Sequence, residues 1–258
     1  EAHPRRQLAY LRWSTRHNAR AARRIIADSI ATRDDLVRFY GTDAAKIDVV
    51  YPGADPHLRR AEDETQIAEA PARYGIRPPY LLYLGTLQPR KNLVRLVEAF
   101  AVSGLHQQGY SLVLAGKAGW LAQSILDAID HQPPAVRDYI RVTGYVDEAD
   151  KAALLSGATA LTFPSLYEGF GFPVLEAQAC GTAVICADTS SLPEVAGEGA
   201  LLVDPLDTAA LAKAMQRVAG DANLRQNLVA AGHANLNRFS WPAAAVRVLD
   251  ILEAAAAP

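Results

Sequence analysis

Hydrophobic residues occur along most of the chain in short, near-continuous runs rather than at every second position. Six such runs lie at 80–85, 111–116, 140–144, 158–164, 183–187 and 201–203. Near-continuous apolar runs of this length are typical of parallel strands that are covered on both faces. The runs therefore predict a parallel sheet buried between two layers of helices.

The segments between these runs predict the helices. We expect them at 92–100, 120–130, 148–156, 173–179, 192–195 and 207–233. In the first of these segments, apolar residues follow the i, i+3, i+4, i+7 spacing of an amphipathic helix. Strands that alternate with helices in this way predict an α/β fold with a doubly wound, Rossmann-like parallel sheet.

The pattern before residue 80 is less regular. Strands are expected at 24–28 and 47–51, and between them Thr32 is expected to cap a helix that ends at Gly41. The segment 55–79 is rich in Pro, Arg, Glu and Ala, which predicts a linker with a short helix. We expect a domain boundary in this segment.

The first 24 residues contain seven arginines and one acidic residue, and they predict a basic helix with a cap at Ser14 or a break near His17. A basic face of this kind could contact phosphates or anionic lipid. It could also be an ordinary solvated helix face, or an interface with another domain. The solvated face or the domain interface is the simpler interpretation of the pattern.

Charge and composition exclude several classes of function. The chain has 258 residues, with 26 Lys and Arg against 28 Asp and Glu, and this balance argues against bulk nucleic-acid binding. No apolar run is long enough to span a membrane, and no signal peptide is recognisable, so we expect a cytoplasmic location. Two cysteines are too few for a disulfide scaffold. Met215 is the only methionine, so we expect further residues before residue 1.

The loop at 85–92 is the first candidate site. Ligands of doubly wound sheets bind at the carboxyl ends of the strands, in the loops that precede helices. Arg90 and Lys91 stand in such a loop, close to the expected helix start. An arginine can hold a phosphate with two hydrogen bonds and a lysine adds a point charge, so the pair suits a diphosphate. A solvated Arg-Lys pair in an exposed loop is the alternative.

The loop at 164–176 is the second candidate site. Gly169 and Gly171 allow the backbone to approach a ligand closely, and Pro173 suits the first turn of a helix. Glu168 in the loop and Glu176 in the expected first turn could face one crevice, where carboxylates would accept hydrogen bonds from sugar or ribose hydroxyls. Alternatively, Glu176 acts only on the helix dipole.

Other chemistries have little support. No zinc spacing of Cys and His, no P-loop and no nucleophile elbow occurs in the sequence. Lys117 lies near the same expected edge of the sheet, and Tyr145 is expected in the core or the wall of the site. A dehydrogenase is disfavoured because no GxGxxG turn follows the first strand of the regular region.

Several motifs in order resemble a known family. The run Glu168-Gly-Phe-Gly-Phe-Pro-Val-Leu-Glu176 resembles the E-x7-E signature of retaining nucleotide-sugar glycosyltransferases of family 4. The segments Gly-Thr-Leu-Gln-Pro-Arg-Lys-Asn, Leu-Ala-Gly-Lys-Ala-Gly-Trp, Gly-Tyr-Val and Ser-Ser-Leu-Pro-Glu-Val are also similar to the family's motifs. The resemblance covers about residues 23–250. It implies the glycosyltransferase-B architecture of two Rossmann-like domains, of which the C-terminal one binds the donor.

The resemblance also implies roles for the catalytic residues. Arg90 and Lys91 would hold the diphosphate and offset the charge that builds on the leaving group. Glu168, with the backbone of Phe170 and Gly171, would contact the transferred sugar. Retention of configuration is usually explained in this family by attack on the face of the leaving diphosphate. No metal and no cofactor are expected, because the two cations and a helix dipole would take that role.

The remaining expected contacts concern the nucleotide. By resemblance, Glu176 would bind the ribose hydroxyls, and Leu175 and Thr182 would line the nucleotide and phosphate region. Val146 would contact the base through its backbone. Gly85, at the end of the strand before the cation pair, is placed among the binding residues as well.

The resemblance departs from the family's pattern at the front of the chain. Residues 1–55 resemble only the tail of the N-terminal, acceptor-side domain, 56–239 resemble the donor-binding domain, and 240–258 resemble the helix that crosses back. We therefore expect the chain to bind a nucleotide sugar and to transfer sugar poorly or not at all.

Two of the motifs, Gly-Lys-Ala-Gly-Trp and Pro-Ser-Leu-Tyr-Glu-Gly-Phe-Gly-Phe-Pro, resemble those of bacterial mannosyl- and rhamnosyltransferases of surface-polysaccharide synthesis. GDP-mannose is the first expectation for the donor, with a glycan or lipid-linked glycan as acceptor and a peripheral contact at the inner face of the plasma membrane. Two alternatives stay open: a nucleotide-sugar epimerase of the same architecture, and a non-catalytic nucleotide-sugar-binding module.

Overall fold

The computed structural model describes residues 5–256 and divides into two compact units. The larger unit is Asp55–Leu236, and the smaller combines Glu1–Ala54 with Asn237–Pro258. Residues 1–4 and 257–258 lie outside the described residues. The predictions for 1–24, 1–55 and 240–258 therefore fall partly outside the described residues.

The larger unit is built on a six-stranded sheet. Its strands are β3 (Tyr80–Leu84), β4 (Ser111–Ala115), β5 (Ile140–Gly144), β6 (Ala160–Phe163), β7 (Val184–Ala187) and β8 (Ala200–Val203). They run parallel in the order β5-β4-β3-β6-β7-β8. All residues of β4, β6 and β7 are buried, so both faces of the sheet are covered. The prediction of a doubly wound parallel α/β sheet is confirmed.

The strand order places a topological switch point between β3 and β6. The chain leaves β3 toward β4 and β5 on one side, then returns to β6 and continues to β7 and β8 on the other side. The two central strands pair in register, with Leu81 beside Ala160 and Leu82 beside Leu161. The loops that follow β3 and β6 therefore start as neighbours at the carboxyl edge, which is where open α/β sheets bind ligands.

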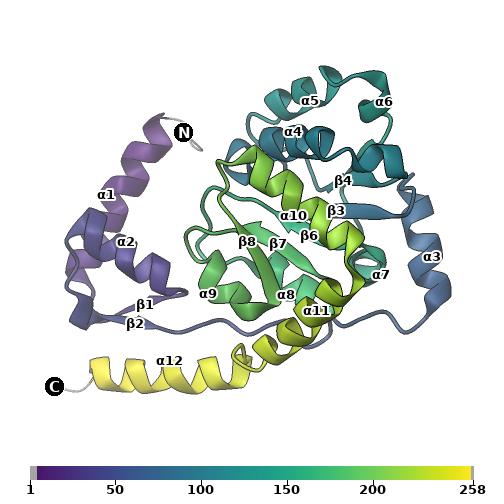
Figure 1. Cartoon of the computed structure of the whole chain (residues 1–258). Coiled ribbons are helices and arrows are strands. Elements are labelled where there is room, and N and C mark those ends of the chain that lie inside the picture. Colours follow the sequence, from purple (N-terminus) through teal and green to yellow (C-terminus); the bar gives the residue numbers. More distant parts are fainter. Residues whose placement is uncertain (1–4, 257–258) are drawn as a thin grey trace. The chain divides into compact units, whose positions relative to one another are not determined.

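The connections of the larger unit are mostly helical. They comprise α3 (Glu64–Arg73), α4 (Leu93–Ser103), α5 (Gln123–Asp130), α6 (Pro134–Arg137), α7 (Glu148–Gly157), α8 (Phe172–Ala179), α9 (Leu192–Ala196), α10 (Thr208–Gly220) and α11 (Ala222–Leu236). Short 3₁₀ turns occur at η2 (Pro89–Lys91), η3 (Leu105–Gln108) and η4 (Gly197–Gly199). Helix α10 packs on α4, and α11 packs on α8 (Figure 1). The expected helices are all present, and the segment expected at 207–233 forms two of them.

Aromatic side chains fill the centre of the sheet. Tyr83 on β3 stacks on Phe163 on β6, with ring centroids 5.9 Å apart and an interplanar angle of 10°. Tyr80 is fully buried, and its hydroxyl donates a 2.6 Å hydrogen bond to the carbonyl of Leu154. Burying a large apolar ring stabilises the fold by about 2–3 kcal/mol, provided that its polar atom keeps a partner. These contacts fix the two strands from which the candidate loops emerge.

The smaller unit contains α1 (Arg5–Ala21), β1 (Ile25–Ala27), α2 (Ile30–Tyr40), η1 (Ala44–Lys46), β2 (Ile47–Val49) and α12 (Trp241–Ala256). Strands β1 and β2 pair in parallel as a two-stranded sheet. The two strands expected before residue 55 are therefore present.

Two details of the smaller unit differ from the sequence predictions. Ser29, not Thr32, caps α2: its hydroxyl accepts a 2.9 Å hydrogen bond from the Thr32 backbone N–H, which places Thr32 in the first turn. Helix α1 continues through Ser14 and His17 without a break, because the Ser14 hydroxyl donates to the carbonyl three residues earlier instead of capping a new helix. Gly41 ends α2 in the left-handed conformation as predicted, with φ 64°.

Within residues 5–256, every helix is too short or too polar to cross a lipid bilayer.

Candidate functional site

The cation pair and the first glutamate meet at the carboxyl edge of the central strands. Arg90 and Lys91 belong to η2, which follows β3, and Glu168 lies in the loop that follows β6. The Lys91 Nζ atom is 2.6 Å from Glu168 Oε1, and an Arg90 Nη atom is 2.7 Å from Glu168 Oε2. Arg90 also donates a hydrogen bond to the carbonyl of Tyr167. Each carboxylate oxygen thus has its own cation.

This cluster is largely removed from solvent. The side chains of Lys91 and Glu168 are 11% and 9% exposed, and that of Arg90 is 31% exposed. Burial lowers the pKa of Lys91, although the charge of Glu168 opposes that shift. Burial alone would raise the pKa of Glu168, but the positive charges of Lys91 and Arg90 prevail and the pKa lies below its usual value. The glutamate is therefore an ionised carboxylate at neutral pH.

Hydrogen bonds hold the two loops together independently of these charges. The backbone N–H of Leu166 donates to the carbonyl of Arg90 at 2.9 Å. The buried Asn92 side chain donates to the carbonyls of Pro164 and Pro205 at 3.1 and 2.7 Å. Because buried amide groups without partners are costly, these contacts fix the relative position of the loops.

A serine pair fixes the backbone around Glu168. The Glu168 N–H donates to the Ser190 hydroxyl at 3.0 Å. The Ser191 hydroxyl donates hydrogen bonds to the carbonyls of Glu168 and Phe170, at 3.0 and 2.6 Å. Ser190 itself has a positive φ of 52°, so a turn of unusual conformation supports the loop.

Helix α8 begins directly after this loop. Gly171 precedes it with φ 117°, a conformation that favours glycine, and a Cβ atom there would lie 2.8 Å from Leu192. Pro173 is the second residue of the helix, as predicted for its first turn. Phe170 is buried with its ring 5.1 Å from that of Phe172. The N-terminus of α8, with its partial positive charge, therefore follows Glu168 by only a few residues in the sequence.

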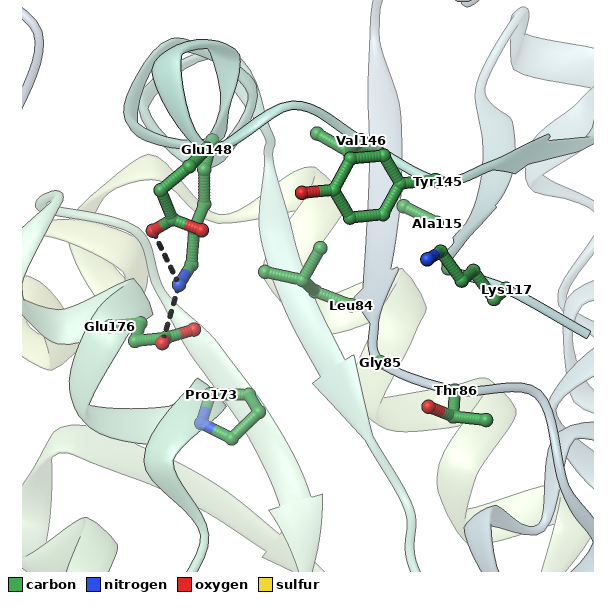
Figure 2. A pocket seen from close by; sticks show the side chains of 12 residues that line it. Leu84, Gly85, Thr86, Ala115, Lys117, Tyr145, Val146, Glu148, Pro173 and Glu176 are labelled. Carbon is green, nitrogen blue, oxygen red and sulfur yellow. Dashed lines mark hydrogen bonds and ion pairs between the residues drawn. The ribbon is translucent and has the colours of Figure 1, made fainter. Parts of the chain in front are cut away.

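A pocket of about 370 Å³ opens at the same edge of the sheet. Its walls come from the ends of β3, β4 and β5 and from α7 and α8, and they comprise Leu84, Gly85, Thr86, Ala115, Gly116, Lys117, Tyr145, Val146, Glu148, Lys151, Pro173 and Glu176. Figure 2 shows Glu148 and Glu176 on one side of the pocket and Tyr145 and Lys117 on the other, with Leu84 between them. One side of the pocket is therefore ionic and the other is partly aromatic.

The ionic side is centred on Lys151 of α7. Its Nζ atom lies 2.6 Å from a carboxylate oxygen of Glu176 and 3.2 Å from one of Glu148 (Figure 2). Burial raises the pKa of Glu176, and the contact with Lys151 offsets that effect only in part. Burial would lower the pKa of Lys151, but the two glutamates raise it above its usual value. Lys151 therefore stays charged and keeps Glu176 in place.

The other side brings the first two loops together. Gly116 has φ 149°, and a Cβ atom there would come within 1.9 Å of the Gly85 carbonyl oxygen. Only glycine permits this approach of the loops after β3 and β4. The ammonium of Lys117 lies 4.7 Å from the centroid of the Tyr145 ring. Tyr145 is 59% exposed, so it forms part of the wall and not of the core.

The structure separates the predicted site residues into two adjoining groups. Gly85, Val146 and Glu176 line the pocket, whereas Arg90, Lys91 and Glu168 form the ionic cluster. The loops 85–91 and 168–176 connect the groups, because each loop contributes residues to both. Phe170 and Gly171 directly precede α8, and Leu175 lies within α8 and is 1% exposed.

Two placements differ from the sequence analysis. Glu176 is the fifth residue of α8, in its second turn, because the helix begins at Phe172. Thr182 precedes β7 at the opposite edge of the sheet, where its hydroxyl donates a 2.6 Å hydrogen bond to the carbonyl of Leu155. Its distance from the pocket follows from topology, since α8 carries the chain from the carboxyl edge back to the amino edge.

Four residues of the site were not predicted from the sequence: Lys151, Glu148, Ser190 and Ser191. Lys151 stands in a helix that reads as an ordinary amphipathic segment, and its partner Glu176 is 25 residues away. The signal for Ser190 and Ser191 was available, because they belong to a motif that resembles the family, but only the fold shows what they hold. Within the described residues, no group of three or more His, Cys, Asp or Glu side chains is arranged to hold a metal ion.

Comparisons with known proteins agree with this fold. Residues 66–234 match the family described as glycosyl transferases group 1, and residues 1–58 match the one described as glycosyltransferase family 4. The chain is 31% identical to O-antigen chain mannosyltransferase B of Escherichia coli, over 93% of this chain and 63% of that protein. It is also 31% identical to a D-inositol 3-phosphate glycosyltransferase of Streptomyces bingchenggensis, over 90% of this chain and 52% of that protein.

Solved structures show the same architecture. HepE of Anabaena, in complex with UDP and glucose, has a TM-score of 0.82 at 21% identity, covering 95% of this chain and 67% of that one. Sucrose-phosphate synthase of Thermosynechococcus elongatus has a TM-score of 0.77 at 26% identity, covering 92% of this chain and 59% of that one. The chain spans between half and two thirds of the curated relatives named above. Because the group 1 match extends over well more than half of its residues, the chain belongs to the glycosyl transferases of group 1.

Proposed function

We propose that this chain binds a nucleoside diphosphate hexose and carries the donor side of a retaining hexosyltransferase. One observation supports the proposal above all: two cations after β3 and a carboxylate after β6 meet at the switch point of a parallel sheet, next to a pocket that holds a second carboxylate. Sheets of this kind bind ligands at that place.

The proposed donor lies across both groups of residues. The base and ribose occupy the pocket, where the Glu176 carboxylate accepts hydrogen bonds from the two ribose hydroxyls and the Val146 backbone faces the base. The diphosphate lies at Arg90 and Lys91, close to the N-terminus of α8, and the hexose lies at Glu168. The volume of about 370 Å³ is in the range of pockets for small ligands.

The proposed mechanism depends on electrostatic stabilisation of the leaving group. As the bond between the sugar and the diphosphate breaks, negative charge grows on the phosphate oxygens. Arg90 and Lys91 stabilise that charge at fixed positions, and the N–H groups at the start of α8 add to it. The proposal uses no metal ion and no cofactor, because these groups already provide positive charge at the place where negative charge develops on the leaving group. The acceptor attacks on the same face, which retains the configuration.

GDP-mannose is the proposed donor, and a glycan or lipid-linked glycan is the proposed acceptor. The support for mannose is the 31% identity to an O-antigen mannosyltransferase of Escherichia coli and to the serotype-specific mannosyltransferase WbdA. The structural neighbour HepE was crystallised with UDP and UDP-glucose, so a uridine nucleotide is the competing possibility. A nucleotide-sugar epimerase and a non-catalytic binding module are the competing functions.

A peripheral membrane contact at the inner face of the plasma membrane, by a cytoplasmic protein, completes the proposal. The support lies in α1, which exposes Arg12, Arg16 and Arg20 together with Trp13, whose side chain is 65% exposed. Basic and aromatic side chains on one helix suit an anionic lipid surface. Co-sedimentation with vesicles that contain phosphatidylglycerol, compared with neutral vesicles, tests this part.

Ligand binding to the purified chain tests the donor proposal. We expect GDP and GDP-mannose to raise the melting temperature at lower concentration than UDP, UDP-glucose and ADP-glucose do, because a ligand that binds the native state stabilises it. A Glu176→Ala variant should lose most of that shift, whereas Glu98→Gln, on the exposed side of α4, should keep it. If no nucleotide shifts the transition at millimolar concentration, the proposed function is wrong.

A further inference from the structure

The ionic cluster holds a carboxylate where the proposed function requires a phosphate. Both oxygens of Glu168 contact the side chains of Arg90 and Lys91, at 2.7 and 2.6 Å. A carboxylate that bridges two cations in this way presents one anionic oxygen to each of them, as a diphosphate can also do. The glutamate and a diphosphate therefore compete for the same two positive groups.

We propose that Glu168 is an internal competitor of the diphosphate, so that the site favours the sugar nucleotide over the nucleoside diphosphate that remains after transfer. The inference rests on the proposed function and adds a second role for the same residue. In the first role Glu168 contacts the hexose. In the second it occupies the cations of the diphosphate site and has to leave them when a diphosphate binds.

The backbone contacts show which motion releases the carboxylate. The N–H and the carbonyl of Glu168 are both held by the serine pair, Ser190 and Ser191, at 3.0 Å each. The backbone is therefore anchored while the side chain retains its own rotatable bonds. Rotation of that side chain, not displacement of the loop, frees Arg90 and Lys91.

The discrimination follows from where the released carboxylate can go. The Glu168 side chain is only 9% exposed, so a carboxylate without a partner is costly there and is repelled by a phosphate at the cations. A sugar nucleotide brings hexose hydroxyls, which donate hydrogen bonds to the displaced carboxylate. A nucleoside diphosphate brings more negative charge and no such donors. Glu168 therefore disfavours the product more than the donor.

A purely structural role for Glu168 makes the opposite prediction. If the carboxylate served only to orient the two cations, its neutralisation would let Arg90 and Lys91 repel each other, and diphosphates would bind more weakly. If it competes with the diphosphate, its neutralisation makes the cations more available and diphosphates bind more tightly. The sign of the change in affinity decides between these roles.

The experiment is isothermal titration calorimetry of Glu168→Gln with GDP, GDP-mannose and inorganic pyrophosphate, which carries neither base nor sugar. We expect the Kd of GDP and of pyrophosphate to fall about tenfold, the effect of one charge-assisted contact. The Kd of GDP-mannose should fall less or rise, so the preference for donor over product shrinks. If nucleotide screening favours uridine, UDP and UDP-glucose replace the guanosine pair.

The control is Glu98→Gln, which removes one negative charge from the exposed side of α4 and should change no Kd by more than about twofold. If Glu168→Gln binds GDP and pyrophosphate no more tightly than the parent chain, the inference is wrong and the proposed function stands. If neither chain binds any of the nucleotides, the proposed function fails and the inference fails with it.

Circular dichroism and the thermal transition establish whether the variant is folded. If Glu168→Gln does not fold, Glu168→Ala decides the question, because it also removes the charge that competes for the cations. Tighter binding of GDP and pyrophosphate to Glu168→Ala supports the inference, and equal or weaker binding overturns it.

Discussion

Replacement of Lys151 by methionine tests whether this partly buried lysine keeps Glu176 ionised. The methionine retains the aliphatic stem of the lysine and removes only the charge and its hydrogen bonds. In the structure, Lys151 Nζ lies 2.6 Å from a Glu176 oxygen, and the two side chains are 15% and 18% exposed. Lys151→Met leaves that carboxylate without the contact that offsets its burial.

The magnitude follows from the exposure of the pair. Loss of one partner of a fully buried ion pair costs about 3–5 kcal/mol, and loss of an exposed pair costs about 0–1 kcal/mol. Both side chains here retain some contact with solvent, so we expect Lys151→Met to lower the free energy of unfolding by about 2 kcal/mol at neutral pH. For a unit of this size, that loss lowers the Tm by roughly 4–8 °C.

The pH dependence has a definite sign. Burial already raises the pKa of Glu176, and removal of Lys151 raises it further. The folded variant then binds more protons than the unfolded chain, so its stability relative to the parent decreases as pH rises. The loss should be small near the usual carboxyl pKa of about 4.3 and should grow as pH rises through the raised pKa of the folded state.

Urea denaturation followed by circular dichroism measures this effect between about pH 4.5 and pH 7.5, a range that starts at the usual carboxyl pKa. Lys213→Met is the control, because Lys213 is an exposed residue of α10. The reasoning is refuted if Lys151→Met loses less than about 0.5 kcal/mol at the upper pH, the usual limit for surface substitutions. A loss that is the same at both ends of the range would also refute it.

Three further predictions concern other parts of the larger unit. Lys91→Met should weaken binding of GDP and pyrophosphate by roughly tenfold or more in calorimetry, and an unchanged Kd would exclude a diphosphate contact by this residue. Asn92→Ala should lower the free energy of unfolding by about 2–3 kcal/mol, because two buried carbonyls lose their hydrogen-bond donor. A free energy of unfolding within about 0.5 kcal/mol of the parent value, measured by urea denaturation, would contradict that. Burial raises the pKa of Cys180 and Cys186 to about 12, so both thiols should react with Ellman's reagent only as fast as the chain unfolds, and rapid labelling of the native chain would show that they are accessible.

The elements of the larger unit were predictable from local pattern. The central strands are near-continuous apolar runs because both faces of the sheet are covered, so positions on either face favour apolar residues. The start of α8 was predictable to within one residue, since Gly171 and Pro173 have conformational preferences that act locally. The cap of α2 was not, because Ser29 and Thr32 are both good caps and only the path of the chain selects one.

The sequence predicted the residue types of the candidate site but not the contacts between them. Arg90, Lys91, Glu168 and Glu176 were recognisable as candidates because their residue types, loops and motif spacing suit a diphosphate and sugar hydroxyls. The contact between Lys91 and Glu168 joins residues 77 positions apart, and strand order brings them together. Spacing alone could not show that the glutamate lies on the cations.

The sequence by itself determined the order of strands and helices and the chemical types of residue at the carboxyl edge of the sheet. Tertiary structure alone decided that Lys151 holds Glu176, that Thr182 lies at the far edge, and that Glu168 bridges Arg90 and Lys91. The physical reason is range. Periodicity and capping act between residues a few positions apart, whereas a buried ion pair forms only when the strand order brings distant loops within a few ångströms and excludes water from them.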